Sequence, residues 1–107
     1  MKNERTQQIL ELKRLSIFLD KHYDNELNFR NHCYLRIAYD ITTRDKWDNK
    51  VAKPFVKYAN NVQLQNVIDL LKKYSSDKKS LLSDNEKSLN FRKLNNFKNE
   101  NSINTLF

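Results

Sequence analysis

The residues best suited to chemistry stand in one stretch, NFRNHCYLRIAYD, which spans residues 28–40. It places His32 directly before Cys33, the only cysteine of the chain. A nucleophilic cysteine needs a lowered pKa and a base within hydrogen-bonding reach. Adjacent positions on a helix point about 100° apart, so these two side chains would not face each other. We therefore expect Cys33 to point inward as a small hydrophobic residue and His32 to mark the start of a helix.

No other set of residues predicts catalysis or metal binding. The second histidine, His22, stands alone, and the chain has neither Cys-x-x-Cys nor His-x-x-x-His spacing, so we expect no metal site. Asp45 and Asp48 could act as paired carboxylates, but the basic residues around them predict surface ion pairs. The chain contains no glycine, which excludes the usual Walker loop, dinucleotide fingerprint and nucleophile elbow. We predict a protein that is not an enzyme and needs no cofactor.

Basic residues mixed with aromatic residues give the stronger functional signal. Between Arg30 and Lys57, seven lysines and arginines stand against three aspartates, and Tyr39, Trp47, Phe55 and Tyr58 lie among them. Such cations bind phosphates, and exposed rings stack on bases. The alternative is that the rings are core and the cations are only solvated. The predicted contact residues are Arg36, Arg44, Lys46, Lys50, Lys53 and Lys57, followed by a second set of Lys78, Lys79, Arg92 and Lys93.

The charge and the cysteine content indicate the kind of partner and compartment. A formal net charge of +7 favours an acidic partner such as nucleic acid, although a lysine-rich composition alone would also produce a basic surface. A single cysteine cannot form an internal disulfide, which suits a reducing compartment, and we expect a cytoplasmic protein. The first eight residues are polar, so we expect no signal peptide. No apolar run approaches the ~20 residues of a membrane span.

Apolar residues recur at three-and-four spacing in four stretches, which predicts helices over residues 3–22, 29–42, 61–74 and 76–95. Residues 43–58 show no such period and contain the only proline, Pro54. We therefore predict an all-α fold: a small single-domain bundle of about four helices with an irregular segment near 43–58. The helical domain should cover residues 1–95, and residues 96–107 should form a flexible C-terminal tail.

The predicted helices indicate which of their apolar residues should be buried. In the first helix, Leu12, Leu15 and Leu19 form the predicted core stripe, widened by Ile9 and Phe18. Leu10 and Ile17 should extend that core, with a partner surface as the alternative. The last helix should bury Leu81, Leu82 and Leu89.

The second helix should keep Arg36, Asp40 and Arg44 largely off its apolar stripe. Asn28, either Asn60 or Asn61, and Ser76 are the expected N-caps. Without glycine, the turns that need a positive φ should use asparagine.

A DNA-reading helix-turn-helix is the alternative function. The stretch NNVQLQNVIDLLKKY carries Gln63, Gln65 and Asn66 near its start, where amide groups could read base edges. A repressor of this type would also dimerise on a two-fold symmetric site. The preceding segment contains Pro54 and shows no clear partner helix, which argues against this reading.

Two resemblances add to these inferences. The runs NHCYLRIAYD, DKWDNKVAKPFVKYA and QLQNVIDLL, within residues 31–92, are similar to a short segment that accompanies acetyltransferase domains in bacterial proteins. This likeness transfers no catalytic residue, and an acetyltransferase core would need a glycine-rich loop.

The overall profile (short, basic, glycine-free and without a catalytic motif) resembles phage-type anti-CRISPR proteins. That resemblance implies a non-enzymatic inhibitor of a nucleic-acid-handling complex, which acts on a CRISPR nuclease or its guide RNA. The expected partner is thus RNA, single-stranded nucleic acid or a ribonucleoprotein nuclease, and no membrane. The oligomeric state stays open.

Overall fold

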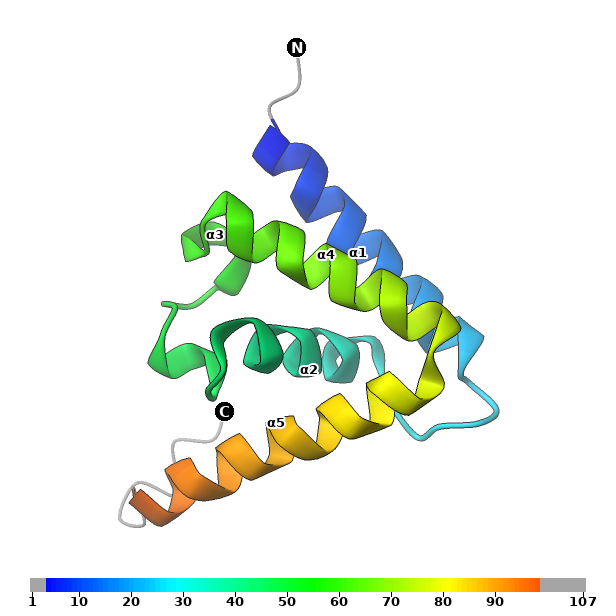
Figure 1. The fold of residues 1–107 in the computed structure, drawn as a ribbon. Helices are drawn as coiled ribbons and strands as arrows, with labels where there is room; N and C mark the ends of the chain where they lie inside the picture. Colours follow the sequence, from blue (N-terminus) through cyan, green and yellow to red (C-terminus); the bar gives the residue numbers. More distant parts are fainter. Residues whose placement is uncertain (1–3, 99–107) are drawn as a thin grey trace.

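Four helices of three or more turns form the body of the computed structural model, which describes the backbone of residues 4–98 and the side chains of residues 4–93 (Figure 1). These helices are α1 (Glu4–His22), α2 (Asn31–Thr43), α4 (Asn61–Ser76) and α5 (Lys78–Lys98). A 3-10 turn, η1 (Trp47–Asn49), and a single helical turn, α3 (Phe55–Tyr58), lie between α2 and α4. No strand occurs within this described part, and the predicted all-α bundle is confirmed.

Side-chain contacts define how the helices are paired. Gln8 near the start of α1 reaches Asn61 at the start of α4, and Tyr23, just after α1, donates to the carbonyl of Tyr74 near the end of α4, at 2.6 Å. The two helices therefore run side by side in the same direction, as Figure 1 shows. α2 runs in the opposite direction and packs on both of them.

α5 runs parallel to α2 along the other edge of the molecule. Arg36 of α2 bonds to Asn85 and Ser88 of α5, and Asp40, one turn later in α2, bonds to Ser88 and Arg92. The four helices thus form a thin body, with principal extents of 46 × 35 × 19 Å. Its thickness is about two helix diameters.

The shared core lies between α1, α2 and α4. Its fully buried side chains come from the predicted stripes of these three helices and include Leu12, Leu19, Tyr34, Ile37, Leu64, Val67, Leu71 and Tyr74. α5 adds Leu81 at its beginning. No helix in the described residues is long and apolar enough to cross a membrane.

Three apolar residues of α1 are exposed, contrary to the prediction that they join the core. Leu10 and Ile17 are each 55% exposed, and Phe18 is 45% exposed and stacks on His22. The reason is the position of α1 at an edge of the body, where α2 and α4 pack against its opposite side. These residues occupy the side of α1 that faces solvent.

α5 presents a different face to the body than the sequence pattern indicated. Leu81 and Ser88 are completely buried, whereas Leu82 and Leu89 are exposed. Neighbouring residues on a helix point about 100° apart. The prediction was right for Leu81 but wrong for Leu82 and Leu89, which each lie one position after a buried residue. The hydrogen bonds of Ser88 to Asp40 and Arg36 determine this orientation.

The helix caps are partly those expected. Asn60 accepts from the backbone N–H of Gln63 while the Gln63 side chain accepts from the N–H of Asn60, which forms a complete capping box. The predicted caps Asn28 and Ser76 are wrong. α2 begins only after Arg30, without a side-chain cap, and Asp77 accepts from the backbone N–H of Ser80 at the start of α5.

α5 also ends later than predicted. The helix continues to Lys98, which is three residues past the predicted end of the domain. Residues 99–107, the rest of the expected flexible tail, lie outside the described part of the chain.

Candidate nucleic-acid interface

Residues 44–57, which carry five of the six contact residues of the first predicted set, are tied to α2 through Asp40. The backbone N–H of Trp47 donates to the Asp40 carboxylate at 3.0 Å, and the N–H of Asp45 donates to the Asp40 carbonyl at 3.2 Å. Asp45 in turn accepts from the N–H of Lys46 at 2.7 Å. The segment is irregular, as predicted for residues 43–58, but its backbone is held to a helix by specific bonds.

Three aromatic rings pack this segment onto the body. Tyr39 and Phe55 stack with their ring centres 3.9 Å apart, and the Trp47 ring meets both edge to face. Burial raises the pKa of Tyr39 to about 12. Tyr39 and Phe55 are therefore core residues with no face free for a base, whereas Tyr58 is 54% exposed and available for stacking.

The five cations of residues 44–57 fall into two groups. Lys46 and Lys53 approach the same carboxylate, that of Asp48, at 3.7 and 3.5 Å. This pairing agrees with the ion pairs expected around Asp48. Arg44, Lys50 and Lys57 are exposed and have no ion pair with any described residue. We call these five cations, Arg44, Lys46, Lys50, Lys53 and Lys57, the basic end.

Arg44 has an unusual backbone. Its φ is 57° and its ψ is 36°, so it adopts the left-handed conformation just after α2, and its N–H bonds back to the helix. Among the described residues it is the only one with a positive φ, so the expectation that asparagine would fill this role is wrong. The left-handed turn ends α2 and directs the chain towards Trp47.

Lys57 is placed by a residue that the sequence does not single out. Arg5 of α1 donates to the carbonyls of Val56 and Lys57, at 2.6 and 2.8 Å, and to the side chain of Asn61. These bonds fasten α3 to the first turn of α1. Arg5 lies about fifty positions earlier in the chain, and no pattern in the sequence connects it with this segment.

Two predicted contact residues, Arg36 and Arg92, bond to side chains within the protein instead. The Asp40 carboxylate is fully buried and accepts from Arg92 through two nitrogens, at 2.9 and 3.2 Å, and from Ser88 at 2.6 Å. Arg36 donates to Ser88 and Asn85. Arg36 and Asp40 therefore lie against α5, which corrects the expectation that both face away. We call this group (Arg36, Asp40, Asn85, Ser88 and Arg92) the α2–α5 lock.

The α2–α5 lock changes the titration of Arg36. Burial, followed by the nearby positive charge of Arg92, lowers the pKa of the Arg36 guanidinium. Two arginines can lie this close because the Asp40 carboxylate and the Asn85 and Ser88 side chains accept their N–H groups. We exclude Arg36 and Arg92 from the basic end for this reason.

The rest of the second predicted set does not form one surface. Lys78 and Lys79 begin α5, and Lys78 pairs with Glu26 at 3.1 Å in the connection after α1. Lys93 is exposed four turns later in α5, next to Arg92. The described chain thus presents cations at both ends of α5, and only the basic end gathers them within a single segment.

His32 and Cys33 lie at the start of α2. His32 is exposed, and Cys33 is partly exposed, so the expectation of a fully inward thiol is only partly correct. Within the described residues, no group of three or more histidine, cysteine, aspartate or glutamate side chains converges as a metal site would require.

The geometry also bears on the helix-turn-helix alternative. The helix before α4 is α3, which has only four residues, and 17 residues separate α2 from α4. Gln63 belongs to the capping box, and Gln65 bonds to Asp69 and Gln8. Among the described helices, α4 has no preceding partner of the length that the motif uses.

Comparison of the whole chain with protein-family models, with curated proteins and with solved structures finds no match.

Proposed function

We propose that this protein is a non-enzymatic binding protein whose basic end holds the phosphate backbone of RNA or single-stranded nucleic acid. The observation that carries the proposal is the arrangement of residues 44–57: five cations against two aspartates, on a segment fixed by the Asp40 bonds and the Trp47 ring. A fixed segment presents its charges with little loss of conformational freedom on binding. The exposed ring of Tyr58, with the Lys57 ammonium 5.4 Å from its centre, provides a stacking surface for a base.

Single strands suit this surface better than duplex DNA. Stacking on Tyr58 requires an unpaired base, and the described helices do not include the helix pair that would enter a major groove.

A protein of this kind inhibits a nuclease when it occupies the strand that the nuclease must hold. The resemblance to anti-CRISPR proteins points to a CRISPR nuclease or its guide RNA as that target. As a stoichiometric inhibitor, it should stop cleavage at about one protein per complex, without turnover. A cleavage assay titrated with the protein tests this part of the proposal separately from simple binding.

The direct test of the basic end is a salt series of nucleic-acid affinities. Binding of a labelled single-stranded RNA is compared between the parent and a variant with Arg44→Glu, Lys50→Glu and Lys57→Glu. Three lost phosphate contacts should reduce the slope of log affinity against log salt by about 2, since each contact on a single strand contributes about 0.7.

The matched control carries the same charge change at exposed lysines outside both predicted contact sets, with Lys13→Glu, Lys21→Glu and Lys73→Glu. It should retain more of the slope than the first variant. Equal losses in the two variants would show that net charge alone drives binding, and the basic end would then lose its assignment. Circular dichroism confirms that both variants keep their helices.

A further inference from the structure

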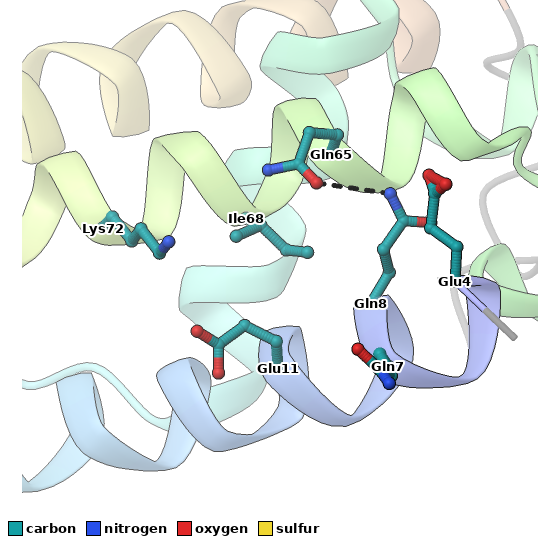
Figure 2. A pocket seen from close by; sticks show the side chains of 7 residues that line it. All are labelled: Glu4, Gln7, Gln8, Glu11, Gln65, Ile68 and Lys72. Atoms are coloured by element: carbon teal, nitrogen blue, oxygen red, sulfur yellow. Dashed lines mark hydrogen bonds between the residues drawn. The ribbon is translucent and has the colours of Figure 1, made fainter. Parts of the chain in front are cut away.

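A polar groove lies between α1 and α4, separate from the basic end. Its hollow has a volume of about 390 Å³. Figure 2 shows the side chains that line it: Glu4, Gln7, Gln8 and Glu11 come from α1, and Gln65, Ile68 and Lys72 come from α4. A second hollow of about 310 Å³ shares Glu4, Gln8 and Gln65 and continues towards Asn61, Val62 and Asn66. Together they are large enough for an extended side chain.

Gln8 is the central residue of this groove. It is only 6% exposed, and its Nε2 donates to the carbonyl of Asn61 at 3.2 Å and to Oε1 of Gln65 at 3.3 Å. Both partners are acceptors, so the amide orientation is determined and Oε1 is the other atom. This Oε1 is buried and has no hydrogen-bond partner among the described residues.

A buried carbonyl oxygen without a hydrogen bond lowers the stability of the fold by about 1–3 kcal/mol. A donor from outside the described chain that bonded to Gln8 Oε1 would remove this cost. Gln8 lines both hollows, so its buried acceptor lies beside the groove.

The charges of the groove favour a positively charged donor. The negative charge of Glu11, at the far end, is already paired with a cation. Glu11 accepts from Arg14 at 2.7 Å, and this bond, together with the nearby charge of Lys72, lowers the pKa of Glu11. Glu4 lies one helical turn before Gln8, and no ion pair or hydrogen bond joins its side-chain carboxylate to another described residue. Uncompensated negative charge is therefore found at the Glu4 end, beside the unpaired oxygen of Gln8.

We propose that the Glu4–Gln8 end of this groove binds a guanidinium or ammonium group. Glu4 supplies the opposite charge, Gln8 Oε1 accepts one N–H, and the exposed side chain of Val62 contacts the aliphatic stem. The group comes from an arginine or lysine of a protein partner or from a free polyamine. This site does not depend on the basic end, so the two proposals succeed or fail separately.

The test is a titration of the ¹⁵N-labelled full chain with a short peptide that contains one arginine, followed by nuclear magnetic resonance. The side-chain NH₂ signals of Gln8 should shift, and a peptide with citrulline in place of arginine, which keeps the shape but not the charge, should leave them unchanged. Titration with spermidine is the second arm. A response to spermidine alone identifies a free polyamine as the ligand, and a response to the arginine peptide identifies a protein side chain.

Variants separate the site from general charge effects. Glu4→Gln should weaken binding of the responding probe at least fivefold, whereas Glu86→Gln, the same change at an exposed position of α5, should leave it unchanged. Gln8→Met keeps the size of the side chain and removes the acceptor. It should weaken binding of the responding probe, followed through the backbone amide signals of Glu4 and Gln65, while the helix content stays the same. If neither probe moves the Gln8 signals, or if Glu4→Gln and Glu86→Gln weaken binding equally, the proposal is overturned.

Discussion

Arg44 shows how one residue can serve two requirements that conflict. Its exposed guanidinium belongs to the basic end, yet its backbone holds the left-handed conformation that usually falls to glycine. A side chain with a Cβ atom is destabilised in this conformation by about 1 kcal/mol relative to glycine. The chain therefore carries a small local strain at a position where a positive charge is presented.

Replacing Arg44 by glycine should separate the two roles. We expect Arg44→Gly to raise the free energy of unfolding by about 1 kcal/mol, because the strain is relieved, while RNA affinity falls with the lost cation. Arg44→Ala removes the same charge but keeps the Cβ atom, so it should lower affinity without the gain in stability. Urea denaturation of the three proteins measures the difference. Equal stability of the glycine and alanine variants would contradict this account.

At this scale the sequence allowed only part of the site to be predicted. The cations of residues 44–57 could be named because their density is visible in the sequence. The roles of Arg36 and Asp40 could not, since their partners Ser88 and Arg92 stand about fifty positions later. The identity of the residue with positive φ was also hidden, because an exposed arginine gives no sign of its backbone conformation.

Among the elements, α5 differs from the other helices in how it is attached. Of its described residues, only Leu81 and Ser88 are buried, and the α2–α5 lock supplies the contact further along. Because the Asp40 carboxylate has no exposure to water, its hydrogen bonds come from the protein: Arg92, Ser88 and the Trp47 N–H donate to it.

Breaking the α2–α5 lock at one partner should be costly. We expect Arg92→Met to lower the free energy of unfolding by about 2–3 kcal/mol, because it leaves Asp40 buried without its cation. Adding Asp40→Asn to that variant should recover part of the loss, since the uncompensated charge is removed as well. Urea denaturation provides the double-mutant cycle.

Lys93→Met is the matched control for this cycle, because Lys93 is the neighbouring exposed cation. It should change stability by less than about 0.5 kcal/mol. A loss for Arg92→Met no larger than that of the control would mean that the lock contributes little to the attachment of α5.

The elements themselves were predictable wherever an apolar face repeats. α1, α2 and α4 begin and end within two residues of the predicted bounds, because each buries a regular stripe in the shared core. α5 was harder, since its contacts with α2 are polar and its leucines Leu82 and Leu89 face solvent. Hydrophobic periodicity carries no information about a face that is held by hydrogen bonds.

In the molecule as a whole, four of the five tyrosines are buried in the core. Burial is the first cause that raises the pKa of Tyr23, Tyr34, Tyr39 and Tyr74 above the usual value of 10.0, and the pKa of Tyr34 and of Tyr39 reaches about 12. For Tyr74, the bond that it donates to the Asp84 carboxylate at 2.6 Å adds to this effect. The folded state therefore retains these phenol protons where the unfolded chain loses them.

This difference predicts a loss of stability in alkali. A group whose pKa is raised by folding contributes stability that is complete below the unfolded pKa, near pH 10, and is lost as pH rises through the folded pKa, near pH 12 for Tyr34 and Tyr39. The urea midpoint should fall steadily between these values, and tyrosinate absorbance should increase together with unfolding. Tyr39→Phe should show a smaller fall, because it removes one of the titrating groups. A midpoint independent of pH over this range would contradict the prediction.

The pairing of α1 with α4 also affects the order in which the protein can fold during its synthesis. α1 ends at His22, but α4, its main partner, is complete only at Ser76, more than 50 residues later. At the usual rates of translation this interval lasts about 3–10 s. During that time Leu12, Leu15 and Leu19 lack the main helix that packs on them, so this stretch stays prone to aggregation until α4 has been made.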